Sequence, residues 1–175
     1  RNKIFKDYKA NRGETPEDLI PQFQIIRECV DAFNIPQIQI EGFEADDIIA
    51  SYCKLAEKKK IKSIIVSSDK DLMQLVNKDI TMLDPMKNKT IGIEQVIEKF
   101  GLPPEKVIQI QALTGDKVDN IPGAPGIGPK TAFQLIEEFG DVNNLIENVE
   151  RIPQEKRRNA INDHKDEILV SLELV

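Results

Sequence analysis

One run of β-branched residues, SIIVSS at 63–68, limits the possible fold more than any other stretch of this chain. Its length and composition are typical of a strand buried in a parallel sheet. A helical pattern covers 45–58 before it, and a short helical pattern covers 71–76 after it. Residues 80–83 predict another strand, and the alternating apolar and polar residues of 35–40 predict an earlier one. Strands that alternate with helices in this way predict an α/β fold with a parallel sheet.

The second half of the chain has a different pattern, in which strand signals stop at about residue 90. Helical patterns follow one another instead, several of them opened by proline and closed by glycine. The predicted helical segments are 93–100, 103–114, 129–139, 143–152 and 158–175. We therefore predict an α/β unit over residues 1–90 and an all-helical unit over residues 91–175.

Composition excludes several kinds of protein. No apolar run reaches the ~18 residues that a membrane-spanning helix needs, and the basic start does not resemble a signal peptide. Cys29 and Cys53 are widely separated, which favours a reducing, cytoplasmic setting. His164 is the one histidine of the chain, so a Cys/His zinc site or a histidine-dependent triad is not expected. Any chemistry must then be carried by carboxylates, lysines and a hard metal ion.

Carboxylates follow the predicted strands at the point where each strand ends. Asp69 and Asp71 follow 63–68, while Glu44, Asp46 and Asp47 follow 35–40. The carboxyl edge of a parallel sheet is the usual site of a binding crevice. Two unit charges ~4 Å apart repel by ~4 kcal/mol at an effective dielectric constant of ~20, so neighbouring carboxylates need a cation.

Oxygen ligands alone favour Mg²⁺ or Mn²⁺ over Zn²⁺. Two simpler interpretations stay open when each motif is taken singly: Asp46 is a helix N-cap, or the segment around Asp69 is a polar turn. Together, at successive strand ends, the motifs favour a metal site.

A third acidic pair, Asp116 and Asp119, precedes a glycine-rich stretch, IPGAPGIGPKTA at 121–132. Taken alone, the pair is a polar loop. The stretch is more specific, because glycines directly before a proline-initiated helix are typical of a helix–hairpin–helix that holds a nucleic-acid backbone. An ordinary tight turn is the alternative. The stretch is not a Walker loop, since G-x-x-x-x-G-K-[ST] does not occur.

Four motifs together resemble the 5′ nuclease, or flap endonuclease, family. This family includes the 5′→3′ exonuclease domains of bacterial DNA polymerase I enzymes. They are YKANR at 8–12, EADD at 44–47, SSDKDLMQLV at 67–76 and GDKVDNIPGAPGIGPKTA at 115–132, and they stand in family order over the whole chain. The resemblance implies a parallel-sheet PIN-like nuclease subdomain followed by a helical subdomain with a helix–hairpin–helix of the H3TH type. It also implies metal-dependent hydrolysis of DNA in replication and repair, such as primer removal and nick translation.

The resemblance assigns roles residue by residue. The family's metal ligands match Glu44, Asp46, Asp47, Asp69, Asp71, Asp116 and Asp119, which implies two Mg²⁺ or Mn²⁺ ions. Lys9 and Arg12 match basic residues beside the scissile phosphate and the passage for the 5′ strand, where Tyr8 either stacks on a base or is structural. The DNA-binding hairpin matches Gly123, Gly126, Gly128, Lys130 and Thr131, and the family's hairpin also binds K⁺.

The expected partner is DNA with a 5′ flap, a nick or a 5′ end, bound by a monomer in the bacterial cytoplasm. The family pattern begins with a further α/β stretch and two more aspartates that precede Arg1, so this chain by itself is expected to cleave poorly. The expected continuation is a polymerase region, although a stand-alone nuclease remains an alternative. Two rival functions also remain: a non-catalytic DNA-binding module, and a ribonuclease with a similar carboxylate site.

Overall fold

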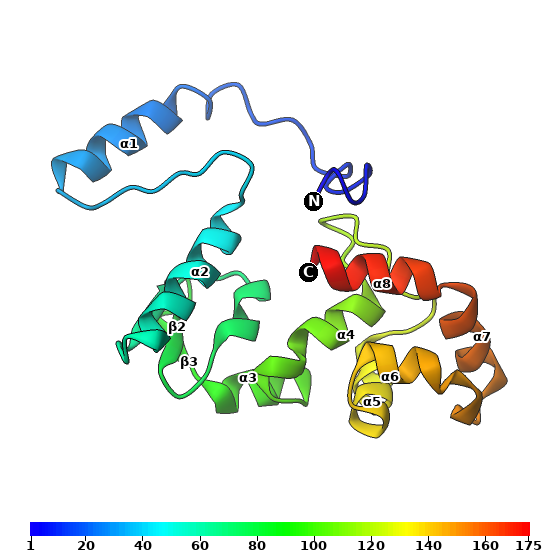
Figure 1. The fold of residues 1–175 in the computed structure, drawn as a ribbon. Coiled ribbons are helices and arrows are strands. Elements are labelled where there is room, and N and C mark those ends of the chain that lie inside the picture. Colours follow the sequence, from blue (N-terminus) through cyan, green and yellow to red (C-terminus); the bar gives the residue numbers. More distant parts are fainter.

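The computed structural model describes residues 1–175 and contains a small sheet with helices and a helical unit beside it (Figure 1). The helix at 93–100 lies beyond the predicted boundary at residue 90, yet its Val96 belongs to the core of the sheet unit. The first unit is built from α2 (Ala45–Lys58), β1 (Ser63–Val66), η1 (Asp71–Leu75), β2 (Ile80–Asp84), β3 (Lys89–Ile91) and α3 (Ile93–Phe100), where η marks a 3-10 helix. The sheet order is β1-β2-β3. β1 and β2 are parallel, with Ser63 opposite Ile80.

Two strand predictions were wrong. β3 was missed; it pairs antiparallel with β2, with Met82 opposite Ile91, so the sheet is mixed. Residues 35–40 form no strand, because their polar side chains bind the neighbouring helix α1 (Gln22–Ala32) instead. The Gln37 amide donates to the Arg27 carbonyl at 2.9 Å and to Asp31 at 2.6 Å.

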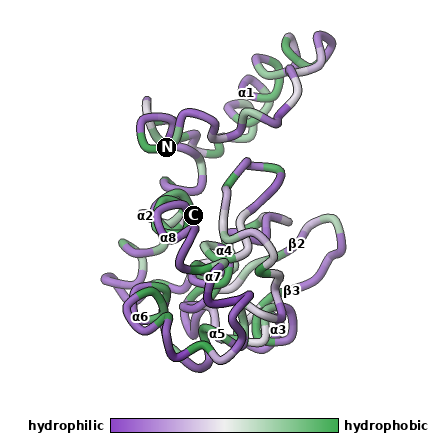
Figure 2. Tube along the Cα trace, turned by 90° about the vertical axis from the view of Figure 1, so that its right-hand side faces the viewer, coloured by the Kyte–Doolittle hydropathy of each residue, from purple (hydrophilic) through white to green (hydrophobic).

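Residues 14–43 form an excursion that projects from the molecule and carries α1 (Figure 1). No residue of α1 is buried. Figure 2 shows hydrophobic residues recurring along this projecting segment. They are Ile20, Phe23, Ile25, Ile26, Phe33, Ile35, Ile38, Ile40 and Phe43, all of them exposed.

The helical unit follows α3 and consists of η2 (Pro104–Lys106), α4 (Val107–Thr114), α5 (Pro129–Phe139), α6 (Val142–Glu147), η3 (Val149–Arg151), α7 (Glu155–Asp163) and α8 (Lys165–Leu174). Glycine ends α3, where Gly101 adopts the left-handed conformation at φ 79°. The single helix predicted over 158–175 is in fact two, since the backbone of His164 leaves the helical region at φ −121° and ψ 24°. None of the helices is both long enough and apolar enough to cross a membrane.

Each unit has its own hydrophobic core. In the α/β unit, residues of the sheet, α2 and α3 pack around Met82 and Val96, both fully buried. In the helical unit, Leu113, Ala132 and Leu145 are fully buried at the centre of a larger cluster. A third, small cluster of Tyr8, Ile121 and Leu174 fastens the start of the chain to the helical unit.

Two glycines, Gly115 and Gly123, bring the start and the middle of the loop between α4 and α5 into backbone contact. The Gly123 amide donates to the Ser171 hydroxyl of α8 at 2.9 Å. A Cβ atom on Gly123 would lie 2.3 Å from the backbone nitrogen of Gly115, closer than any real contact. Gly123 also has a positive φ of 59°. The close approach therefore requires glycine at this position.

Replacing Gly123 by alanine is expected to destabilise the protein more than the same change at Gly126. Both glycines have positive φ, which costs an alanine about 1–2 kcal/mol. Gly126 has open space around its Cα, whereas Gly123 has none, so Gly123→Ala also has to displace backbone. We expect the free energy of unfolding of the Gly123→Ala variant to be lower than that of the Gly126→Ala variant by about 2 kcal/mol or more. Urea denaturation of the two variants measures the difference, and equal midpoints would contradict it.

Candidate active site

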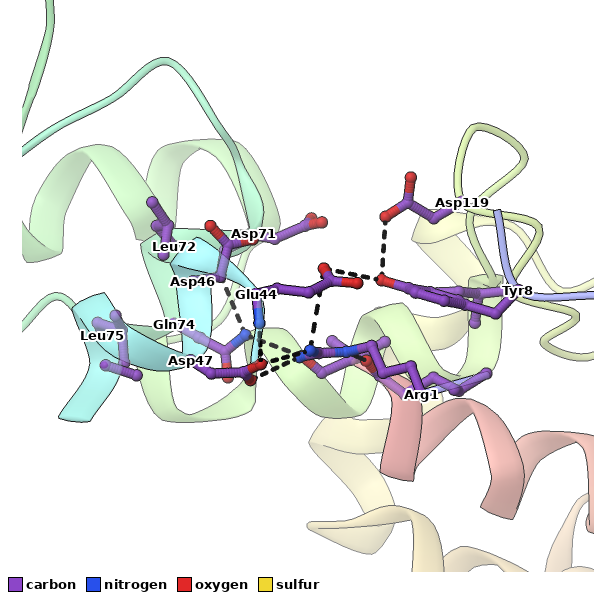
Figure 3. A pocket seen from close by; sticks show the side chains of 14 residues that line it. Arg1, Tyr8, Glu44, Asp46, Asp47, Asp71, Leu72, Gln74, Leu75 and Asp119 are labelled. Atoms are coloured by element: carbon purple, nitrogen blue, oxygen red, sulfur yellow. Dashed lines mark hydrogen bonds and ion pairs between the residues drawn. The ribbon is translucent and has the colours of Figure 1, made fainter. Parts of the chain in front are cut away.

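A cavity of about 160 Å³ lies where the two units and the start of the chain meet (Figure 3). The first turn of α2, the start of η1, the loop before Ile121 and the end of α8 form its walls. Its charged and polar lining consists of Arg1, Tyr8, Glu44, Asp46, Asp47, Gln74, Asp71 and Asp119. Five of the seven predicted metal ligands therefore line one cavity, while Asp69 and Asp116 lie beside it in the same two loops.

The acidic segment at 44–47 starts a helix rather than ending a strand. The N-cap role considered for Asp46 belongs to Glu44. Asp47, at the third position of α2, completes the capping box by accepting the backbone N–H of Glu44 at 3.0 Å. Arg1 donates to both carboxylate oxygens of Asp47 at 2.8 and 3.0 Å and to the Leu174 carbonyl at 2.8 Å. The hydrogen bond from Arg1 holds the pKa of Asp47 below its usual value.

The loop after β1 positions the second acidic pair. The Asp69 N–H donates to the Ser67 hydroxyl at 3.0 Å, and the Asp71 N–H donates to the Asp69 carboxylate at 3.0 Å. The Gln111 amide of α4 donates to Asp71. Gln111 is buried, and its Oε1 atom has no hydrogen-bond partner. The helical unit therefore fixes the orientation of a carboxylate that belongs to the α/β unit.

The third acidic pair lies in a tight turn between α4 and α5. Backbone hydrogen bonds of 2.9 and 2.8 Å join Asp116 and Ile121 across this turn. Asp116 accepts the Val118 N–H at 2.7 Å, and its other oxygen pairs with Lys70 at 2.5 Å. Burial raises the pKa of Asp116, but the hydrogen bonds from Lys70 and the backbone outweigh it, so the pKa is lowered. Lys70 thus links the loop of Asp69 and Asp71 to the turn of Asp116 and Asp119.

The basic residues near the start of the chain bind the same carboxylates. Lys9 pairs with Glu44 at 2.6 Å and lies 3.8 Å from Asp119. Arg12 pairs with Asp119 at 2.6 Å. The Tyr8 hydroxyl lies between Glu44 and Asp119, at 3.4 and 3.5 Å from their carboxylates (Figure 3). Tyr8 itself is buried in the small third cluster, with Ile121 and Leu174.

Two carboxylates of the cavity lack sufficient positive charge. The pKa of Asp46 is raised by burial and by the charges of Asp69 and Glu44. The pKa of Asp71 is also raised by burial, which the Gln111 hydrogen bond only partly offsets. Ionised carboxylates at these positions therefore repel one another, and a cation would relieve that repulsion.

The donor chemistry of the cavity fits a hard divalent cation, because the oxygens of carboxylates are the ligands that such ions prefer. No three Asp, Glu, His or Cys side chains lie close enough together in this structure to share one ion. Lys9, Arg12, Lys70 and Arg1 instead pair with Glu44, Asp119, Asp116 and Asp47.

The glycine-rich hairpin lies outside the cavity, at the start of α5. Gly126, Gly128, Lys130 and Thr131 line no part of the carboxylate cavity. Gly126 has a positive φ of 81°, which favours glycine. Gly128 has an ordinary extended backbone, at φ −90° and ψ 174°, and no atom lies within 4 Å of the position that a Cβ on it would take. Neither the conformation nor the packing of the chain requires glycine at 128.

Sequence reasoning missed three residues that shape the cavity: Arg1, Lys70 and Gln111. Neither Arg1 nor Lys70, which stands between two aspartates, carries a sequence signal of its own. The apolar run around Gln111 did contain one usable sign, since a polar side chain in a helix that is otherwise buried needs a polar partner.

Two family models together match the whole chain. Residues 1–101 match the 5′-3′ exonuclease N-terminal resolvase-like domain, and residues 102–175 match the 5′-3′ exonuclease C-terminal SAM fold. A DNA polymerase I from Rhizobium leguminosarum is 57% identical over all 175 residues, which are 17% of its own length. A 5′-3′ exonuclease from Aquifex aeolicus is 39% identical over the whole chain, which covers 59% of that relative. The chain thus spans less than two thirds of these relatives.

Solved structures show the same fold. The flap endonuclease of bacteriophage T5, in a pseudo-enzyme-product complex with DNA and metal ions, is 26% identical and superposes with a TM-score of 0.85. The alignment covers 99% of this chain and 68% of that one. A structure of the same phage protein co-crystallised with metal ions gives the same values. The carboxylate cavity, the two matched models and this shared fold agree, and the chain belongs to the 5′-3′ exonuclease family.

Proposed function

We propose that this chain is the catalytic region of a metal-dependent 5′→3′ exonuclease and 5′-flap endonuclease that hydrolyses phosphodiester bonds in DNA. The observation that carries the proposal is the cavity in which Glu44, Asp46, Asp71 and Asp119 meet from three separate segments. The names of the relatives support the reaction, and the phage complex supports DNA as the substrate and metal ions as cofactors.

The seven carboxylates are proposed to hold two Mg²⁺ or Mn²⁺ ions. A two-metal site supplies an activated water and stabilises the leaving oxygen of a phosphodiester. Asp46 and Asp71 suit this role best, since each carries negative charge that no ion pair of the structure neutralises. Asp47 would act from further out, because Arg1 and the helix cap already occupy its oxygens.

The cations around the cavity are proposed to exchange partners when DNA binds. Lys9 is in contact with Glu44, and partial burial works against its charge, but the hydrogen bonds to Glu44 and Tyr8 raise its pKa. It is therefore a permanent cation that can turn from a carboxylate to a phosphate. Arg12, half exposed beside Asp119, is placed to do the same for the 5′ strand.

The hairpin is proposed to hold the duplex backbone. The support is Gly128, a surface glycine that the fold itself does not need, directly before the first turn of α5. The absence of a side chain there lets a phosphate approach the helix N-terminus, where Lys130 and Thr131 are exposed or half-buried. A K⁺ ion at this hairpin is part of the same proposal. Gly123 contributes indirectly, because its amide is bound to Ser171.

The remaining parts of the proposal concern the whole protein. We infer an α/β nuclease unit and a DNA-binding helical unit; the sequence predicts their boundary at residue 90, whereas the packing of α3 on the sheet favours one after Phe100. We also infer a monomeric cytoplasmic protein with a polymerase region in the same polypeptide. The relatives named DNA polymerase I support that last inference. The relative from Aquifex aeolicus is named only as a 5′-3′ exonuclease, which supports the alternative of a nuclease without a polymerase region.

Asp71→Asn and Asp116→Asn in the full-length protein are expected to lower cleavage of a 5′-flap DNA by about 100-fold or more, because each removes a negative oxygen from the metal site. Binding of the same DNA, measured by fluorescence anisotropy in Ca²⁺, should be retained. Asp163→Asn, on the exposed face of α7, is the matched control. Unchanged cleavage by both variants would leave a non-catalytic DNA-binding module as the function.

Gly128→Ala is expected to weaken binding of duplex DNA by about tenfold, or ~1.4 kcal/mol, because the new methyl group blocks the approach of the phosphate. The fold tolerates the methyl group, so the free energy of unfolding should stay within about 0.5 kcal/mol of the original. Anisotropy titration and urea denaturation measure the two quantities on the same sample. Equal DNA affinities would contradict the proposed role of the hairpin.

The choice of DNA over RNA is tested with a matched pair of 5′-flap substrates that differ only in the sugar of the flap strand. The family assignment predicts faster cleavage of the DNA flap. Preferential cleavage of the RNA flap would support the ribonuclease alternative instead.

A further inference from the structure

We propose that a second cavity, between the β2–β3 hairpin and α3, binds a backbone phosphate of the DNA substrate outside the carboxylate cavity. The inference rests on the proposed function, since it places an additional contact for the same substrate. The cavity has a volume of about 370 Å³. The residues that matter for the proposal are Ser68, Asp84, Lys87, Lys89, Gln95 and Lys99.

This second cavity lies at the same edge of the sheet as the proposed active site. Ser68 directly precedes Asp69 in the loop after β1, and Asp84 is the last residue of β2, which runs parallel to β1. The segment after β1 contributes to both cavities, with Asp71 and Leu72 in the first and Ser68 and Met73 in the second. A strand of DNA that is cut beside Asp69 and Asp71 would have neighbouring phosphates within reach of this cavity.

Positive charge in the second cavity is only partly balanced. Asp84 is buried and fully occupied: it accepts the N–H groups of Met86 and Lys87, and its second oxygen lies 3.7 Å from the Lys87 ammonium. Glu98, the other acid of the lining, is exposed to solvent, as are Lys89 and Lys99. Lys89 and Lys99 take part in none of the ion pairs of the structure. Two ammonium groups thus line one cavity without an ion pair, although the Lys99 ammonium lies 5.5 Å from the centroid of the Phe100 ring.

The lysines also repel one another. The pKa of Lys99 is lowered by partial burial and further by the charges of Lys70 and Lys87. Lys70 is the residue that pairs with Asp116 at the carboxylate site. Positive charge therefore extends from Lys70, beside the first cavity, to the β2–β3 hairpin. An anion bound in the second cavity would relieve the repulsion between these lysines.

The lining selects a phosphodiester rather than a base. It contains no aromatic side chain on which a base could stack, and its apolar members are Met73 and Ile91 alone. Lysine binds phosphate as a point charge and does not read base edges. The contact is therefore expected to be independent of DNA sequence and to add to affinity rather than to the chemical step.

The test is the double variant Lys89→Gln/Lys99→Gln in the full-length protein, with Lys58→Gln/Lys59→Gln at the far end of α2 as the charge-matched control. Binding of a nicked duplex is measured by anisotropy in Ca²⁺ at several salt concentrations. We expect the dissociation constant of the double variant to rise several-fold, and the slope of log affinity against log salt to fall by about 1 per phosphate lost. The control should match the original protein in both.

A second measurement locates the phosphate. A set of nicked duplexes carries one neutral methylphosphonate linkage at successive positions. For the original protein, one position beside the cleavage site should weaken binding, and the double variant should be insensitive to that same position. Single-turnover cleavage at saturating DNA should be unchanged in the double variant.

The outcomes separate the two proposals. If the original protein fails to bind or cut the DNA, the proposed function itself is wrong. If it binds and cuts, and the double variant keeps the same affinity, salt slope and methylphosphonate profile, the second phosphate site is wrong while the proposed function stands. Equal losses of DNA affinity in the double variant and in the control would also overturn the second phosphate site, because the effect would then reflect the overall charge of the protein.

Discussion

Repulsion between like charges is the constraint on which the rest of this structure depends. Seven carboxylates gather around one cavity and its two adjoining loops, and each must be offset by a cation, a hydrogen bond or a proton. The chain supplies cations from distant positions: Arg1 to Asp47, Lys9 to Glu44, and Lys70 to Asp116. These pairs tie the start of the chain, α2 and the loop after α4 together, so the charge balance of the cavity also holds the two units in place.

The hydrophobic cores set the frame in which these charges meet. Each unit buries its own cluster, and Gln111 of α4 reaches from the helical core to Asp71 of the α/β unit. The clash that a side chain at Gly123 would cause shows how tightly the loop carrying Asp116 and Asp119 is clamped to the end of α4. A rigid clamp at this point matters because a hydrolytic site tolerates little displacement of its groups.

Much of the fold could be predicted from local patterns. The helix over 45–58, the parallel strand pair and the glycine-terminated helices follow from periodicity and from capping signals, and they are confirmed. The strand predicted over 63–68 forms over Ser63–Val66. The strand at 35–40 and the missed β3 show the limit, because a short alternating segment becomes a strand only if a neighbour offers its backbone. For 35–40 the glutamines bind α1, whereas 89–91 finds β2 as its partner.

The acidic residues of the candidate site could be predicted from the sequence, but the basic residues that pair with them could not. Aspartates and glutamates at the ends of elements are visible in the sequence, whereas the pairing of Arg1 with Asp47 joins residues far apart along the chain. Only tertiary structure decides such pairs. The distinction between Asp47, which is held by its cap and Arg1, and the less compensated Asp46 is likewise a product of packing.

The excursion that carries α1 has a consequence for how the molecule would respond to heat or denaturant. Since α1 buries no residue, its formation contributes almost nothing to the cooperative unfolding of the two cores. Substitutions in α1 would therefore leave the melting temperature of the protein almost unchanged. Amide exchange along α1 would report local opening alone, decoupled from the transition that destroys the cavity.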